Sequence, residues 1–307
     1  MIILGLKKYT KMNSRKTIKI ADQDIVFLSY DEQNAEQNYA DLKRKIPWAK
    51  RVHGVEGSDA AHKACADVSE TKHFITVDGD TIVDPEFLNV VLDLDSMGLD
   101  DDYQFSWCGN INVNGLRYGN GSLKMWTKDF VKNMRTHENT DGSDETQIEF
   151  CYFKNYYQLN ENYSTSIINT IPIQAWRAGF REGVKMSLNK GKKIHDVNKD
   201  IWWQNLHKLL IWMNVGTDVK NGWWSCFGAR QGSYLTLCTD WDIAQTRDFD
   251  ALNKLWAKTQ QDNPEVLIEK YSKALITKGV NIGLQPLEPQ QSKFFKQVYI
   301  NNPRRFK

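Results

Sequence analysis

Three short strand-like runs, the first and third of them mainly apolar, constrain the fold of this sequence more than any other feature. They occupy residues 24–30, 49–54 and 73–77. A polar, helix-tolerant stretch at 32–45 separates the first two, and small residues recur at helical spacing over 60–68 before the third. Because continuous apolar runs are typical of strands covered on both faces, this alternation predicts a parallel, doubly wound α/β sheet.

The ends of these runs hold the residues best placed for chemistry, since ligands of such sheets bind beyond the carboxyl ends of the strands. Tyr30, Gly54 and Asp78 fall at such ends, and Asp78-Gly79-Asp80 follows the third run directly. Two aspartates that flank a glycine can hold a divalent cation, which neutralises the charge of a diphosphate leaving group. The alternative is a turn with solvated carboxylates that helps to start the next helix.

Position, and not the Asp-x-Asp pattern itself, distinguishes Asp78 and Asp80. The same spacing recurs at Asp22/Asp24, Asp93/Asp95, Asp100/Asp102, Asp240/Asp242 and Asp248/Asp250. Of the six pairs, only the one at 78 and 80 follows a buried apolar run and flanks a glycine. We therefore assign the metal to this pair.

The rest of the chain gives a mixed pattern. We expect helices at 85–94, 175–188 and 201–213, a strand at 103–107, a tight loop at 118–122, an extended Gly- and Trp-rich segment at 221–237 and a helical tail at 249–277. Residues 1–20 form an N-terminal arm, 21–198 the catalytic core and 199–307 a helical and aromatic extension on the acceptor side. The boundary near Asn198 is weakly marked, so one continuous domain is the alternative.

Composition narrows the class of protein without naming a partner. Forty Lys and Arg against 38 Asp and Glu leave a net charge of +2, so no global field selects a nucleic acid or an anionic membrane. The five cysteines include no Cys-x-x-Cys pair, which predicts reduced thiols and no zinc site. With no signal peptide or long apolar run, we expect a cytoplasmic protein that does not enter a membrane.

Several short motifs, taken in order, resemble one enzyme family. They are residues 24–32, 49–55, Val77-Asp78-Gly79-Asp80, Tyr118-Gly119-Asn120-Gly121 and residues 175–182. Together they look like glycosyltransferases of the GT-A fold encoded by tailed bacteriophages, over residues 24–185. The resemblance implies a Rossmann-like, mixed and mostly parallel sheet, a UDP-sugar donor, Mn²⁺ or Mg²⁺ on the Asp-x-Asp pair, and work in the host cytoplasm.

Some members of the wider phage group glycosylate hydroxymethylcytosine in phage DNA, and the arabinosyltransferases of T-even-like phages are the nearest comparison. The resemblance therefore favours a pentose such as arabinose, or a hexose, as the transferred sugar, and phage DNA as the acceptor. The alternatives are the same chemistry on lipopolysaccharide, protein or a small molecule, and a non-catalytic protein that binds nucleotide-sugar or DNA.

The donor site is expected to involve Tyr30 and Arg51 near the base or phosphate, with Gly54, Gly79 and Arg181 beside the nucleotide-sugar. The alternatives are a packed tyrosine and a surface arginine. Candidates for acceptor binding share flexible backbone or flat side chains. They are Gly119, Asn120, Gly121, Trp176, Trp223, Trp224 and Arg230. Trp202, Trp203 and Trp212, on a predicted helix, are expected in the core.

A catalytic carboxylate is needed if the anomeric centre inverts, because a base must accept the proton of the acceptor hydroxyl. Asp144, Glu149 and Glu182 are the candidates, and the sequence does not choose among them or between inversion and retention. Glu182 has the alternative of a surface ion pair with Lys185. His195 is a candidate third metal ligand, with a solvated loop histidine as the alternative.

Overall fold

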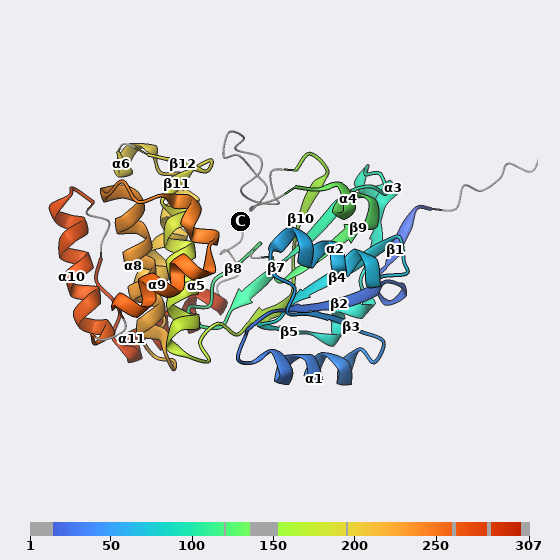
Figure 1. The fold of residues 1–307 in the computed structure, drawn as a ribbon, viewed down its shortest axis with the longest axis horizontal. Helices are drawn as coiled ribbons and strands as arrows, with labels where there is room; N and C mark the ends of the chain where they lie inside the picture. The colour runs from blue at the N-terminus through green and yellow to red at the C-terminus, as the bar shows by residue number, and fades with distance from the viewer. Residues whose placement is uncertain are drawn as a thin grey trace, which may run out of the picture.

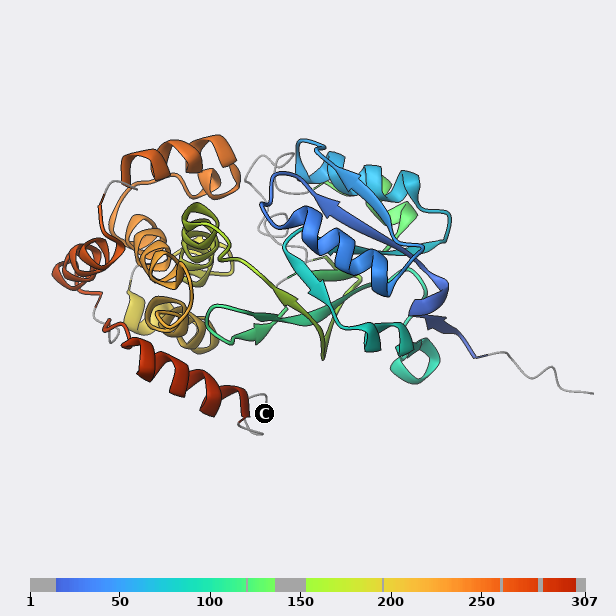
Figure 2. The same cartoon turned by 90° about the horizontal axis from the view of Figure 1, so that it is seen from below.

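The chain divides into an α/β part built on a mixed sheet and a helical part beside it (Figure 1). The computed structural model describes residues 15–119, 121–135, 153–194, 196–259, 262–280 and 284–301. The predicted α/β fold, a mixed sheet flanked by helices with a helical C-terminal extension, is confirmed. The long strand β10 (Tyr156–Ser166) leads from the sheet into helix α5 (Pro172–Met186) (Figure 2).

The remaining elements of the α/β part come in chain order before β10. They are β1 (Thr17–Lys19), η1 (Ile20–Asp22), β2 (Asp24–Ser29), α1 (Ala35–Lys45), β3 (Lys50–His53), α2 (Ser58–Val68), β4 (His73–Asp78), β5 (Thr81–Val83), η2 (Pro85–Asn89), β6 (Val91–Asp93), α3 (Leu94–Met97), β7 (Gln104–Ile111), β8 (Arg117–Tyr118), β9 (Leu123–Thr127) and α4 (Lys128–Asn133). The η elements are short 3₁₀ helices.

Within the described ranges, the main sheet has the strand order β3-β2-β4-β9-β7-β10-β5, and β8 pairs with β7. As predicted, β3, β2 and β4 are parallel neighbours. β9 is antiparallel to both β4 and β7, whereas β7 and β10 are parallel. Leu28 of β2 lies opposite Asp78 of β4, so the two strands end at the same edge of the sheet.

Helices cover both faces of β2 and β4, which explains their continuous apolar runs. Ile25, Phe27, Ile75 and Val77 belong to a core shared with Leu42 of α1. The alternate residues Val26 and Phe74 pack in a different core with Cys65 and Ala66 of α2. Each strand thus buries both sets of side chains, as parallel strands do.

The helical part follows β10. After α5 it contains β11 (Leu188–Asn189), β12 (Lys192–Lys193), α6 (Val197–Asp200), α7 (Trp203–Asn214), α8 (Gly222–Cys238), η6 (Ile243–Arg247), α9 (Phe249–Thr259), α10 (Pro264–Thr277) and α11 (Pro289–Asn301). None of the described helices is long and apolar enough to cross a bilayer. The four cysteines within the described residues, Cys65, Cys108, Cys226 and Cys238, are free thiols, and Cys151 lies outside those residues.

Helices α5 and α8 touch through glycines. A Cβ added to Gly179 would lie 2.0 Å from the Ser225 carbonyl oxygen, and one added to Gly183 would lie 2.2 Å from that of Ala229. From α8, Gly228 approaches the Trp176 carbonyl oxygen equally closely. The predicted extended segment at 221–237 is therefore wrong: its glycines serve helix contact, and the segment is α8.

Two further predictions are corrected. The expected helix at 85–94 is the 3₁₀ helix η2 followed by the short strand β6, which pairs with β1. Trp212 is buried as predicted, but Trp202 and Trp203 are 49% and 67% exposed because they lie at the start of α7. α5, which precedes the expected boundary near Asn198, packs with α8 in the helical part.

Candidate functional site

The strand-end residues Asp78, Gly79 and Asp80 connect β4 to β5 and are held from three sides. The Asp78 amide donates to the Ser122 carbonyl oxygen at 3.2 Å, and the Ile167 amide donates to the Asp80 carbonyl oxygen at 2.8 Å. Asn38 of α1 donates to the Gly79 carbonyl oxygen at 3.0 Å. The backbone of this turn is thereby fixed, and both aspartates are half-buried.

A third carboxylate, that of Glu32, lies against Gly79. A Cβ at position 79 would be 2.6 Å from Glu32 Oε2, so glycine leaves the space that this side chain fills. The same oxygen accepts a hydrogen bond from the Tyr30 amide at 2.8 Å. The ends of β2 and β4 therefore bring together three acidic groups: Glu32, Asp78 and Asp80.

Crowding of these groups changes their protonation. Burial, with the charges of Asp78 and Glu32, raises the pKa of Asp80 to about 7. Burial also raises the pKa of Asp78, against the opposing influence of Lys124 and Arg181, and that of Glu32, against its hydrogen bond from Tyr30. Among the described residues, none of the three carboxylates forms a salt bridge. The site thus has negative charge that lacks a paired cation.

Two arginines of α5 face this edge from the helical part. Arg177 and Arg181 are four residues apart on one side of the helix, and both guanidinium groups lie near the Phe249 ring, at 4.6 and 6.0 Å from its centroid. Neither forms an ion pair with a described carboxylate, and the Nε atom of each is buried without a hydrogen-bond partner. Burial, together with the like charge of Arg181, lowers the pKa of Arg177, which Asp31 and Glu32 partly offset. These arginines could bind an anion beside the carboxylates.

The loop at 118–122 also borders the turn. Gly121 has a φ of +93°, and a Cβ there would lie 2.4 Å from the Lys124 Nζ atom. Lys124 donates to the Gly121 carbonyl oxygen at 2.8 Å, and its charge acts on Asp78. Gly119 approaches the side chain of Gln158. The predicted tight loop is therefore beside the strand-end carboxylates, although Asn120 lies outside the described residues.

The predicted donor-side residues on β3 and at the ends of β2 and β3 differ in availability. Tyr30 is 46% exposed. Arg51 forms a bidentate pair with Glu36 at 3.0 and 2.6 Å, donates to Ser29, and stacks on the Tyr39 ring at 5.1 Å. Gly54, with a φ of +71°, donates its amide to the Ser29 carbonyl oxygen. Arg51 would need to break its ion pair with Glu36 before its guanidinium could bind a phosphate through two hydrogen bonds.

Two predicted acceptor residues are enclosed in the helical core. Trp176 is fully buried and donates to Gln231 at 2.8 Å. Arg230 is also fully buried and donates to Ser272 and Asn214. Neither side chain can stack on an acceptor in this arrangement, because both are enclosed where α8 packs on its neighbouring helices.

Trp223 and Trp224 are partly buried against a hydrophobic core of the helical part, and Trp224 packs edge-on against Trp256 with ring centroids 4.9 Å apart. Their signal in the sequence, aromatic residues between glycines, is equally typical of a closely packed helix. Because Trp223 and Trp224 pack against this core, they offer less free ring surface than a stacking site needs.

Of the predicted catalytic carboxylates, the structure describes Glu182. Its Oε2 atom accepts a hydrogen bond from the Tyr118 hydroxyl at 2.7 Å, and Lys185 lies 3.4 Å from Oε1. Trp212 donates to the same Tyr118 hydroxyl at 3.3 Å. Glu182 therefore links α5 to the loop strand β8. Asp144, Glu149 and His195 lie outside the described residues.

The described residues contain no group of three His, Cys, Asp or Glu side chains arranged to hold a metal ion. Asp78 and Asp80 alone would supply protein oxygens, which suits Mg²⁺ or Mn²⁺, since such ions commonly take one or two carboxylates and complete their shell with water and substrate phosphates. The uncompensated charge at this turn fits a cation.

Sequence reasoning missed Glu32, Arg177 and Lys124. Glu32 lies two residues beyond Tyr30, at the end of the motif at residues 24–32 and at the start of a predicted helix, and neither reading gave it a role in the site. Arg177 had a usable signal, because it lies four residues before Arg181 and so on the same helix face. Lys124 had none, since its place beside Asp78 depends on the pairing of β4 with β9.

No protein-family model and no curated protein matches the chain. Among solved structures, it is similar to a glycosyltransferase involved in the glycosylation of the major capsid of PBCV-1, at 13% identity over 49% of this chain and 98% of that one, with a TM-score of 0.31. It is also similar to S. aureus TarS 1-349, at 10% identity over 90% and 91% of the two chains, with a TM-score of 0.33. A third is the inositol-1-phosphate CTP transferase from T. maritima, at 10% identity over 47% and 69%, with a TM-score of 0.28. Likenesses this remote bear on neither activity nor substrate.

Proposed function

We propose that this chain is a metal-dependent glycosyltransferase that moves a sugar from a UDP-sugar to a hydroxyl group. One observation carries the proposal: at the carboxyl edge of the sheet, Asp78 and Asp80 lie within the electrostatic influence of Arg181 or of each other, and none of the three forms an ion pair with a described residue. A cation and a diphosphate between them would balance both sets of charges. Such balance is the main requirement for the departure of a nucleoside diphosphate.

In this proposal Asp78 and Asp80 hold Mn²⁺ or Mg²⁺, which when bound would stabilise the charge that grows on the leaving phosphate. Arg181 and Arg177 bind the diphosphate oxygens from the side of α5. Tyr30, exposed at the end of β2, packs on the base. The glycines at 119 and 121 let the loop backbone approach the transferred sugar or the acceptor.

Glu182 is the catalytic base that we favour among the described carboxylates if the reaction inverts the anomeric centre. Its hydrogen bond from Tyr118 and its contact with Lys185 hold its carboxylate in one orientation. A retaining reaction would not need it, because the leaving phosphate itself can take the acceptor proton. Glu182→Gln separates the two cases, since it should abolish only an inverting reaction.

For the acceptor we propose hydroxymethylcytosine in phage DNA, on the strength of the resemblance in the sequence, and a pentose such as arabinose or a hexose as the sugar. Lipopolysaccharide, protein or a small molecule is the alternative acceptor. A protein that binds nucleotide-sugar or DNA without turnover is the alternative of another class.

The experiment is to incubate the protein with Mn²⁺ and a panel of uridine sugars, with and without hydroxymethylated duplex DNA, and to measure the release of UDP. Release that DNA stimulates supports the full proposal. Release that DNA leaves unchanged moves the acceptor elsewhere, and metal-dependent binding of UDP-sugar with no release under any condition would reject the enzyme.

A further inference from the structure

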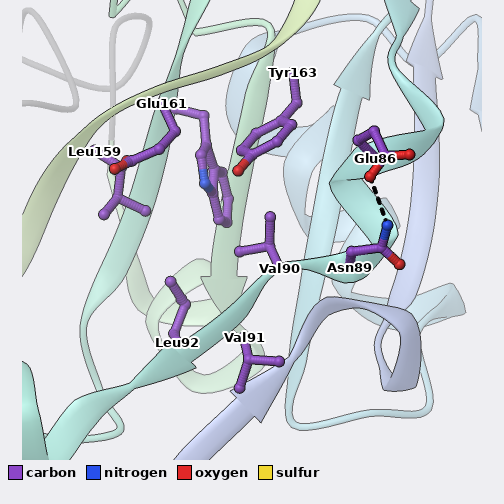
Figure 3. Close-up of a pocket in the computed structure, with 9 residues that line it drawn as sticks. Glu86, Asn89, Val90, Val91, Leu92, Leu159, Glu161 and Tyr163 are labelled. Atoms are coloured by element: carbon purple, nitrogen blue, oxygen red, sulfur yellow. Dashed lines mark hydrogen bonds between the residues drawn. The ribbon is translucent and has the colours of Figure 1, made fainter.

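A recess of about 370 Å³ lies where η2 and β6 approach β7 and β10, and it shares no residue with the strand-end site (Figure 3). Its walls are apolar and come from Val90, Leu92, Leu159 and Trp107. Figure 3 shows Glu161 and Tyr163 on one side of the recess and Glu86 with Asn89 on the other. The volume is at the lower end of the range of small-ligand sites, roughly 300–1,000 Å³.

The rim of this recess has negative charge without a counterion. Among the described residues, no lysine or arginine pairs with Glu86 or Glu161; Glu86 accepts one hydrogen bond, from Asn89 at 2.7 Å. Lys19 is the cross-strand neighbour of Val91, yet it forms an ion pair with neither glutamate. The recess therefore presents two carboxylates with which an incoming cation could pair.

Trp107 supplies an independent sign of a missing partner. The residue is 1% exposed and lines the recess, but nothing among the described residues accepts a hydrogen bond from its indole N–H. The nitrogen is not among the fully enclosed atoms that lack a partner, so it retains access to solvent in the recess. Because this N–H is free to donate into the recess, the recess suits a ligand with a hydrogen-bond acceptor.

We propose that this recess binds a basic side chain, lysine or arginine, together with its own main-chain carbonyl, from a basic segment of a partner protein. The cationic head pairs with Glu161 and Glu86 at the rim and lies against the Tyr163 ring. The aliphatic stem covers Val90 and Leu92, and the carbonyl oxygen accepts from Trp107. A free polyamine matches the charge but not the N–H, because it has no carbonyl. This proposal does not depend on the glycosyltransferase activity.

The test uses three probes that separate these contacts: Nα-acetyl-lysine N-methylamide, Nα-acetyl-norleucine N-methylamide and cadaverine. Binding is followed by the ¹⁵N-indole resonance of Trp107 in the full chain, assigned with the variant Trp107→Phe. We expect the lysine amide to shift this resonance and to bind at least about tenfold more tightly than either other probe, since each lacks one of the two polar contacts.

The double variant Glu86→Gln with Glu161→Gln should weaken the lysine amide by at least about tenfold and leave the norleucine amide unchanged. Glu265→Gln, at an exposed position of α10, is the matched control and should have no effect.

Equal binding of cadaverine would indicate a plain polyamine site, and equal binding of the norleucine amide would indicate a merely apolar groove. Either result, or an unmoved Trp107 resonance, overturns the proposal. The rate of UDP release should be the same in the Glu86→Gln, Glu161→Gln double variant and in Glu265→Gln.

Discussion

The two sides of helix α5 make two different kinds of close contact with the rest of the molecule. On one side Gly179 and Gly183 bring the backbone of α5 onto that of α8, and nothing is left to bind there. On the other side Arg177 approaches Glu32 beyond β2 and Arg181 approaches Asp78 at the end of β4, and neither arginine forms an ion pair with them. The first contact stabilises the fold. The second leaves opposite charges unpaired, as is typical of a site that awaits a ligand.

The largest test of this contrast removes the charges at the sheet edge. Asp78→Asn combined with Asp80→Asn should lower UDP release by about 10³-fold or more, because the cation loses its protein ligands. The circular dichroism spectrum should not change. The matched control is Asp100→Asn with Asp102→Asn, an exposed Asp-x-Asp pair that should retain full activity. An active 78/80 variant would disprove the metal site.

The next test acts on the packed side of α5. Gly179→Ala should reduce the free energy of unfolding by about 3 kcal/mol, because its Cβ would lie 2.0 Å from the Ser225 carbonyl oxygen. Gly279→Ala is the control for backbone strain alone: φ is +83° there, but a Cβ would meet nothing within 4 Å. We expect it to cost about 1 kcal/mol in urea denaturation. If the two variants lost the same free energy of unfolding, the backbones of α5 and α8 would have room for a Cβ at position 179.

Removing the facing charge on α5 should have a smaller effect than removing the aspartates. Arg181→Ala should lower kcat/KM for the UDP-sugar by about 10- to 100-fold, since one charged hydrogen-bonding partner of the diphosphate is lost. Arg44→Ala, an exposed arginine of α1 paired with Asp41, should leave kcat/KM unchanged. If Arg181→Ala behaved as the control does, the diphosphate could not lie between α5 and β4.

The raised pKa of Asp80, about 7, predicts that protons compete with the metal. Below pH 7 the carboxyl binds a proton that Mn²⁺ must displace, so affinity should fall by up to about tenfold per pH unit between pH 7 and 5. Above pH 8 it should level off. Titration calorimetry in buffers of different ionisation enthalpy would report the released proton, and a flat profile from pH 5 to 8 would contradict the prediction.

The smallest effect concerns stability. A carboxyl whose pKa is raised by folding binds more protons in the folded state, so stability falls as the pH rises from the ordinary pKa of 3.8 to the folded value of about 7, and the full cost is present above that. Asp80→Asn should therefore raise the free energy of unfolding at pH 8 by about 1 kcal/mol in the absence of metal, and less at pH 5. Thermal denaturation at both pH values measures this. A loss of stability at pH 8 would show that Asp80 is not electrostatically strained.

The sheet was predictable because β2 and β4 are local apolar runs, and because the covering helices lie between β2, β3 and β4 in the sequence. Asp78 and Asp80 followed from the same reasoning, since the end of a parallel strand fixes where they lie. Glu32 and Lys124 were not accessible in this way, because their approach to Asp78 depends on a turn geometry and on an antiparallel pairing with a distant strand. Their positions are set by tertiary contacts that no local pattern encodes.

The helical part was read less well, and glycine explains why. In α8, Gly228 and Gly232 suggested an extended or loop segment, since glycine has low helix propensity. Tertiary contact with α5 outweighs that propensity, and the same glycines become the points where two helices meet. The exposed Trp202 and Trp203 were misjudged for the opposite reason, because apolar character alone does not fix which end of a helix is covered.

The contacts of α11 also bear on the order in which the molecule matures. Lys296 pairs with Asp218 at 2.7 Å and donates to the Val113 carbonyl oxygen at 3.2 Å, across 183 positions of sequence. During synthesis, the loop after β7 would thus wait for a helix made much later. Long-range closure of this kind slows folding and leaves apolar surface open meanwhile. A chaperone that shields the loop after β7 during that interval would be expected to raise the yield of native protein.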